Sequence, residues 1–197
     1  MVRRKVANTL ALAVLGLLQE KSMHPYEMAS TLRERGKDSS FKITTGSLYD
    51  TVAALVRHEW ITPVETVKDG RRPERTVYTT TETGQQEFVS WVDELIRTPV
   101  VEYPKFLAAV SYLGALGPER AADALGERAG QLELQITEAR QMMADTVGSG
   151  LLPRLFMIEG EYGLHVLAAE LEWTVRTRDE IRDGTLTWPA ADGTWSA

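Results

Sequence analysis

The sequence predicts a mainly α-helical protein with one small β-hairpin, divided into two domains. Three short helical patterns come first, and two segments rich in Val, Thr and Tyr follow them around an Asp-Gly turn. Beyond Pro99 the periodicity is only helical, and it is sustained over two long segments. We therefore expect a first domain over residues 1–98, a helical domain over residues 99–183, and a loose tail over residues 184–197.

The composition is typical of a soluble globular protein, with 43% hydrophobic and 25% charged residues. The absence of cysteine excludes disulfides, thiolate metal sites and cysteine nucleophiles. The net charge of −6 is unevenly distributed, because residues 1–84 hold 13 Lys and Arg against 10 Asp and Glu, whereas residues 85–197 hold 9 against 18. A basic first half within an acidic protein indicates a polyanionic partner for that half.

The N-terminus resembles a secretory signal, because Arg3, Arg4 and Lys5 precede an apolar run from Leu10 to Leu18. The run is too short to span a bilayer, and it continues into Gln19 without a small-residue cleavage site. We interpret the protein as cytoplasmic. The basic arm is then either a solvated tail or a contact to phosphate.

Residues 7–20 are expected to form the first helix, capped by Asn8 or Thr9. Its core stripe consists of Leu10, Val14, Leu17 and Leu18. A second helix begins near Pro25, where a missing N–H costs nothing, and ends at Gly36.

The third helix, over residues 44–60, is the segment on which the functional interpretation depends. An apolar stripe on one side of this helix is expected to face the core, and it consists of Leu48, Val52, Leu55 and Val56. The opposite side is mostly small or polar, and it consists of Ser47, Asp50, Thr51, Ala54, Arg57 and His58. Such a helix fits a DNA major groove, although an ordinary amphipathic helix has the same pattern. We expect Ser47, Thr51 and Arg57 to face base edges. Tyr49 is expected to lie half in the core, with its hydroxyl free for phosphate.

A β-hairpin follows, with strands over residues 61–67 and 75–81 and a turn over residues 68–74. Arg71 and Arg72 lie at its tip and Arg75 at its base. Three helices and an arginine-tipped hairpin are the order of a winged helix-turn-helix, in which the hairpin follows the DNA backbone. The wing arginines, together with Arg3 and Arg4, are expected to contact phosphates and to contribute affinity without reading sequence.

The remaining chain is helical over about residues 83–97, 103–116, 119–146 and 153–182. The last two helices have apolar seams: Leu125, Ala129, Leu132, Ile136, Ala139 and Met143, and Leu155, Ile158, Tyr162, Val166, Ala169 and Trp173. Two seamed helices after a DNA-binding unit most simply indicate a homodimer. A helical hairpin within one chain is the alternative.

Aromatic residues of this second domain form a candidate effector pocket for a small planar ligand. The candidates are Phe106, Tyr112, Tyr162 and Trp173, with Phe156 as a further wall and His165 or Glu159 as the polar group. Plain core packing is the alternative, since aromatic residues at helical spacing usually pack a core. A ligand bound here is expected to quench the fluorescence of Trp173.

Catalysis is not expected. The chain has no glycine-rich phosphate loop, no nucleophile elbow and no histidine pair at metal spacing. His165 is a lone histidine beside an apolar stripe, and such residues are usually structural. We predict a protein that is not an enzyme and has no cofactor and no metal.

Several of these motifs together resemble the PadR family of bacterial transcriptional regulators, over about residues 10–182. The resemblance lies in residues 13–18 (Ala-Val-Leu-Gly-Leu-Leu), 24–28 (His-Pro-Tyr-Glu-Met), 46–49 (Gly-Ser-Leu-Tyr) with Ala54-Leu55, 69–75 (Asp-Gly-Arg-Arg-Pro-Glu-Arg) and 77–84 (Val-Tyr-Thr-Thr-Thr-Glu-Thr-Gly). One departure is Pro25, where many relatives have glycine.

The resemblance implies a homodimer that binds a palindromic operator, usually as a repressor, and that dimerises through its C-terminal helices. It also implies DNA contact by Ser47, Tyr49 and the wing arginines, and in some members a planar aromatic effector near the dimer interface. A winged-helix adaptor that binds protein rather than an operator is the alternative function.

Overall fold

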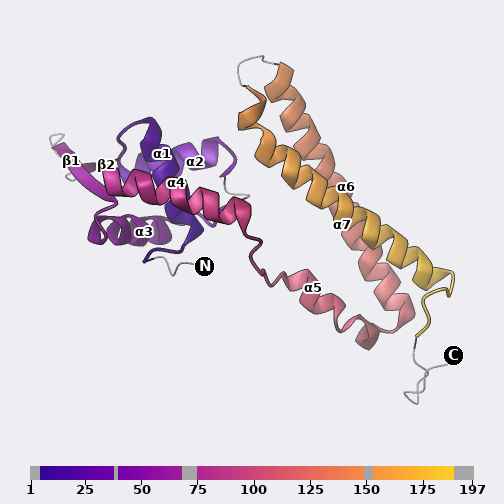
Figure 1. Ribbon diagram of the computed structural model, residues 1–197. Coiled ribbons are helices and arrows are strands. Elements are labelled where there is room, and N and C mark those ends of the chain that lie inside the picture. The colour runs from indigo at the N-terminus through magenta and orange to yellow at the C-terminus, as the bar shows by residue number, and fades with distance from the viewer. Residues whose placement is uncertain (1–4, 38–39, 68–74, 149–152, 189–197) are drawn as a thin grey trace. The chain divides into compact units, whose positions relative to one another are not determined.

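The computed structural model describes residues 5–37, 40–67, 75–148 and 153–188. The predicted fold class is confirmed: the chain is mostly helical with one two-stranded antiparallel hairpin, and it forms two compact units, Met1–Val101 and Glu102–Ala197 (Figure 1). The elements are α1 (Thr9–Glu20), α2 (Pro25–Glu34), α3 (Thr45–Arg57), β1 (Ile61–Val67), β2 (Arg75–Thr80), α4 (Glu82–Arg97), α5 (Lys105–Val110), α6 (Pro118–Gly148) and α7 (Ile158–Arg182), with 3-10 turns at Leu113–Leu116 and Arg154–Phe156.

Side-chain caps fix where the helices of the first unit begin. The Oδ1 atom of Asn8 accepts from the Leu10 amide at 3.0 Å, so Asn8 rather than Thr9 caps α1. The Nδ1 atom of His24 caps α2 in the same way, with Pro25 in the first turn as expected. The predicted C-terminal glycine of α2, Gly36, has a φ of 66°, which suits a glycine that ends a helix.

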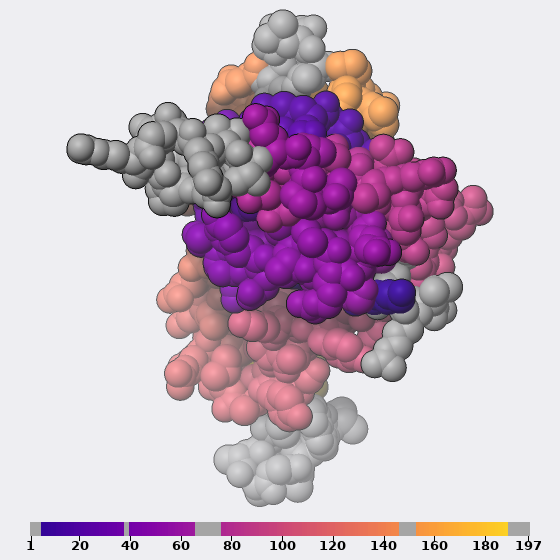
Figure 2. All heavy atoms as spheres, turned by 90° about the vertical axis from the view of Figure 1, so that its left-hand side faces the viewer, coloured from indigo at the N-terminus to yellow at the C-terminus, as the bar shows by residue number. Residues whose placement is uncertain are grey.

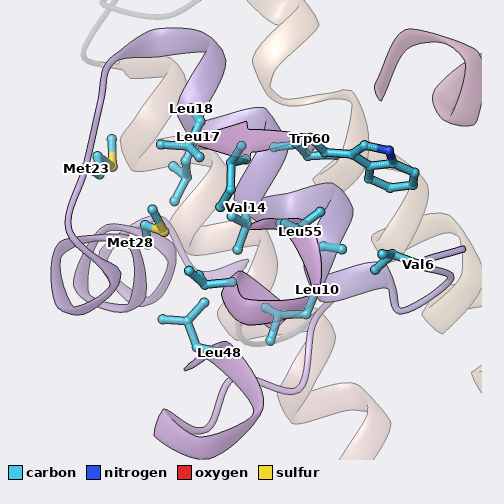
Figure 3. Close-up of a cluster of buried hydrophobic side chains, with 14 of the residues drawn as sticks. Val6, Leu10, Val14, Leu17, Leu18, Met23, Met28, Leu48, Leu55 and Trp60 are labelled. Atoms are coloured by element: carbon cyan, nitrogen blue, oxygen red, sulfur yellow. The ribbon is translucent and has the colours of Figure 1, made fainter. Parts of the chain in front are cut away.

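The core of the first unit is built around α1, whose buried side chains meet those of α2 and α3 (Figure 3). The largest fully buried apolar residues of this core are Leu10, Val14, Leu15, Met23, Met28, Leu48, Leu55 and Ile61. Burial of one such side chain stabilises the fold by about 1.5–3 kcal/mol. This core holds α3 with one face against α1 and the other face uncovered.

The hairpin pairs β1 with β2 in antiparallel register, from Ile61 opposite Thr80 to Val67 opposite Arg75. The register shifts between Pro63 and Glu65, where proline cannot donate to the ladder. On the other side of β2, the amides of Met23 and Tyr78 each donate to the other residue's carbonyl at 3.0 Å. The hairpin is thereby tied to the segment that connects α1 and α2.

An ion pair joins the end of α1 to the end of α2. The Arg35 guanidinium donates two hydrogen bonds to the Glu20 carboxylate, at 2.5 and 2.7 Å. These hydrogen bonds hold the pKa of Glu20 below its usual value. Both side chains are about half exposed, so the pair contributes only a modest stabilisation.

In the second unit, α6 and α7 lie side by side as an antiparallel hairpin (Figure 1). The predicted seam of α6 is buried at Leu125, Ala129, Leu132 and Ile136. The predicted seam of α7 is mostly exposed: the exposed fractions are 55% for Ile158, 71% for Tyr162 and 44% for Val166. The hairpin within one chain therefore accounts for the seam of α6 and leaves the seam of α7 uncovered.

The segment at residues 103–116, predicted as one helix, is shorter in the structure. The α5 helix ends at Val110, and Leu113–Leu116 form a separate 3-10 turn. Gly114 lowers the helix propensity at this point, and the Ser111 hydroxyl donates to the Leu107 carbonyl. Trp188, near the start of the predicted tail, donates from Nε1 to the Gly114 carbonyl at 2.9 Å and packs against the buried cluster of α6 and α7 that includes Leu125 and Ile181. The later tail residues lie outside the described ranges.

Candidate nucleic-acid interface and ligand cavity

The first turn of α3 is closed by a reciprocal capping box. Thr44 Oγ1 accepts from the Ser47 amide, and Ser47 Oγ accepts from the Thr44 amide, both at 3.1 Å. The Ser47 hydroxyl also lies 2.8 Å from Thr44 Oγ1 and 3.0 Å from the Thr44 carbonyl. Ser47, predicted to face base edges, is therefore occupied in fixing the start of the helix.

The uncovered side of α3 differs from the predicted one at Thr51. Only 4% of the Thr51 surface is exposed, and its hydroxyl donates to the Ser47 carbonyl at 2.6 Å. Asn8 Nδ2, from the start of α1, donates to the same hydroxyl at 3.4 Å. Thr51 therefore faces α1 and cannot reach a base edge, which corrects the expectation drawn from the sequence.

Tyr49 and Arg57 lie on the uncovered side of α3. Tyr49 is 47% exposed, so about half of its surface is free, and Arg57 is exposed near the end of the helix. Gly46, Asp50 and Ala53 are exposed beside them, although we had not expected Gly46 or Ala53 on this side. The segment that contains α3 forms much of the surface facing the viewer in Figure 2, where it is purple.

The other predicted DNA contacts lie at or beyond the limits of what the structure describes. Arg71 and Arg72 of the wing tip, and Arg3 and Arg4 of the arm, lie outside the described residues. The backbone of Arg75 pairs with Val67 at the start of β2. The two strands are therefore paired up to Val67 and Arg75, the last described residues on either side of the predicted tip.

The second unit contains a cavity of about 430 Å³ beside α5 and α6. Its lining residues are Phe106, Ala109, Val110, Tyr112, Leu113, Leu116, Ala124, Leu125, Glu127, Arg128 and Gln131. This volume falls within the range of small-molecule sites. Two predicted effector residues, Phe106 and Tyr112, line it.

Trp173 adjoins this cavity through Phe106, because the two rings meet edge to face with centroids 5.8 Å apart. The Arg128 guanidinium lies 3.6 Å above the Phe106 ring and donates from Nε to Glu170 at 2.8 Å. Arg128 and Glu170 were not expected at this site. They are 42 residues apart in sequence, so no local pattern links them.

Tyr162 and His165, the remaining predicted effector residues, lie on the exposed side of α7 and do not line this cavity. The structure therefore groups Phe106, Tyr112 and Trp173 and separates the other two from them. Within the described ranges, no cluster of three or more His, Asp or Glu is suited to a metal ion. None of the described helices has both the length and the hydropathy needed to span a membrane.

Residues 14–90 match the transcriptional regulator PadR-like family. The fold matches Bacillus subtilis PadR in complex with operator DNA, with a TM-score of 0.72 and 18% identity over 88% of this chain and 99% of that one. The structure of that protein with p-coumaric acid matches with the same TM-score and identity, over 89% of this chain and 99% of that one.

The Vibrio cholerae virulence activator AphA matches with a TM-score of 0.69 and 17% identity, over 88% of this chain and 98% of that one. No curated protein matches the sequence. The family is one of transcriptional regulators, and its match runs from within α1 to within α4, so it includes α3 and both strands of the hairpin. Residues 14–90 are therefore similar to the PadR-like family of transcriptional regulators, and the fold of the chain matches that of Bacillus subtilis PadR.

Proposed function

We propose that this chain binds a palindromic operator sequence-specifically as a homodimer and represses the neighbouring genes. The supporting observation is the uncovered side of α3, which follows a tightly capped first turn. A helix with a small and polar free side fits the major groove, which is about 12 Å wide. The operator DNA bound by the Bacillus subtilis relative is consistent with this use of the fold.

In this proposal, Tyr49 and Arg57 contact DNA from the uncovered side of α3, and Ser47 positions the start of that helix. The arginines of the wing and of the N-terminal arm contact phosphates. These are Arg71, Arg72, Arg75, Arg3 and Arg4. Phosphate contacts contribute affinity that depends steeply on salt, and contacts from α3 contribute the choice of sequence.

The test is fluorescence anisotropy of the purified protein on the DNA upstream of its own gene, with a scrambled duplex of equal length as the control. Selective nanomolar binding to a palindrome with half-sites about 10 bp or a multiple apart supports the proposal. Equal weak binding to both duplexes, and to a random pool, favours the adaptor instead. Since the Vibrio cholerae relative is called an activator, a reporter promoter with the operator tests the sign of regulation.

Neutralising the wing in an Arg71→Gln/Arg72→Gln variant is expected to weaken operator binding about tenfold or more. Each lost phosphate contact should lower the slope of log affinity against log salt by about one. The control is Arg120→Gln/Arg140→Gln, which removes the same charge from exposed positions on α6. An unchanged salt slope in the wing variant would show that the wing does not contact phosphate.

For the homodimer, we propose the α7 apolar face, defined as Ile158, Tyr162 and Val166, as the contact with a second copy. These residues are spaced four apart, so they share one side of the helix, and all three are exposed. The buried seam of α6 is already used within the chain. In a two-fold symmetric dimer the α7 apolar face of each copy would pack against that of the other. The same two-fold symmetry would match the two halves of a palindrome.

For an effector, we propose a small planar aromatic ligand in the cavity beside Phe106. Arg128 adds a cation above that ring and a hydrogen-bond donor at the cavity wall. Its existing pair with Glu170 keeps this guanidinium in place, and the pair is only partly exposed. The complex of the Bacillus subtilis relative makes p-coumaric acid a reasonable first probe.

Binding of p-coumaric acid in this cavity is expected to quench the fluorescence of Trp173, because a ligand beside Phe106 changes the surroundings of the neighbouring indole. The measurement is a titration of wild type and Trp173→Phe, which retains an aromatic ring and the other four tryptophans. Quenching that is equal in both proteins would place the ligand elsewhere. Binding detected calorimetrically without any change in emission would also count against this cavity.

A further inference from the structure

The middle of the uncovered side of α3 is a line of four residues, Gly46, Asp50, Ala53 and Arg57. All four are exposed, and their spacings of 4, 3 and 4 place them opposite buried Leu48 and Leu55. Tyr49 and Ser47 lie on the two flanks of this line.

Two members of the line are small, and the other two, Asp50 and Arg57, carry charged groups. Gly46 and Ala53 leave room for the helix backbone to approach the floor of a groove. Asp50 and Arg57 are seven residues apart, which is about 10 Å along a helix. This distance corresponds to about two to three base pairs in a groove.

The carboxylate of Asp50 has no evident structural role. Among the described residues, it takes part in no hydrogen bond or ion pair, and its helical neighbours at i±3 and i±4 are Ser47, Ala53, Gly46 and Ala54. The helix dipole favours a carboxylate within the first turn of a helix. Asp50 is the sixth residue of α3, so it lies beyond that turn and does not gain this stabilisation. Helix stability therefore does not account for an acidic residue here.

In a groove, this carboxylate would be repelled by the phosphates on both sides unless it met a hydrogen-bond donor. Arg57 is two turns away and does not neutralise it. The donors on base edges in the major groove are the amino groups of cytosine N4 and adenine N6. Adenine also presents the N7 acceptor beside its amino group, which a carboxylate does not satisfy, so cytosine is the better match.

Resting on the DNA-binding function proposed above, we propose that Asp50 is a specificity-determining residue that accepts a hydrogen bond from the N4 amino group of a cytosine in each operator half-site. Arg57 then lies opposite a base about two to three base pairs away, where guanine matches its paired donors. The operator half-site is thereby constrained at two positions.

The test is selection of binding sites from a random duplex pool by wild type, Asp50→Asn and Asp50→Ala. Wild type should require cytosine at one position of each half-site, and replacement of that base should weaken binding about tenfold. Asp50→Asn should change the preference at that position to adenine, because an amide donates to N7 and accepts from N6. Asp50→Ala should accept every base there, while the other positions of the motif stay unchanged.

Asp93→Asn is the matched control, since it makes the same change at an exposed aspartate of α4 that pairs with Arg97. It should leave the selected motif unchanged. A wild-type motif that Asp50→Asn and Asp50→Ala also leave unchanged, or an affinity that rises equally for all sequences, overturns the assignment of Asp50 alone. A wild-type selection that enriches no sequence instead overturns the proposed operator binding, and this inference with it.

Discussion

Replacing Gly84 by alanine is expected to destabilise the first unit by about 3 kcal/mol or more. A Cβ atom at this position would lie 1.9 Å from the carbonyl oxygen of Trp60 and 2.9 Å from Thr80 Oγ1. The Trp60 oxygen cannot easily move, because it accepts a hydrogen bond from the Thr81 amide at 3.0 Å. Thr81 in turn caps α4 and donates to the Glu59 carbonyl at 2.6 Å. To relieve this clash, the first turn of α4 would have to move away from the Trp60 carbonyl, which follows α3 in the chain.

The measurement is thermal unfolding followed by tryptophan emission, since Trp60 and Trp91 are buried in the first unit. A loss of this size corresponds to a fall in the midpoint of about 10 °C or more. Gly16→Ala is the control within the same unit, because its Cβ would make only ordinary contacts of 3.7 Å with Phe88. It should be neutral or slightly stabilising. Equal midpoints for the two variants would show that the close approach at Gly84 relaxes at little cost.

Tyr162→Glu is expected to weaken the proposed homodimer about 100-fold or more. It places a charge in the middle of the α7 apolar face, where a second copy would bury it without a partner. Tyr162 is 71% exposed in the single chain, so the fold of the second unit should survive the substitution. Operator affinity should fall as well, because one subunit contacts only one half-site.

Sedimentation velocity over a range of concentrations measures the dimer directly, and circular dichroism checks that the helices persist. The control is Gln135→Glu, which adds the same charge at an exposed polar position on α6. A Tyr162→Glu variant that remains dimeric at the wild-type concentration would place the interface elsewhere. A wild type that is monomeric at all concentrations would contradict the homodimer.

Local chemistry made the elements of this protein predictable. Asn8 and Pro25 fix helix starts by interactions within two or three residues, so the sequence placed the start at Pro25 and narrowed the first cap to Asn8 or Thr9. The two strands lie on either side of the Asp69-Gly70 sequence, which is also a local signal for a hairpin. The helix expected over residues 103–116 is shorter in the structure, because Gly114 lowers the helix propensity of this segment.

The site on α3 could be predicted only in part. Its position and its capped start follow from the sequence, but the boundary between the buried and exposed sides does not. A residue about 60° from the middle of the buried side, such as Thr51, is buried only if another element covers it. Asn8 does so from 43 residues away. The same packing brings Gly46, Asp50, Ala53 and Arg57 to the middle of the free side.

The sequence by itself therefore determined the order of the elements, the fold class and the family resemblance, because these rest on periodicity, caps and motifs of adjacent residues. Only the tertiary structure decided which side of α7 packs inside the chain and which apolar side stays exposed. It also decided that Phe106, Arg128 and Glu170 meet beside one cavity. The physical reason is that periodicity defines the sides of a helix, whereas contacts between residues distant in sequence determine which side is covered.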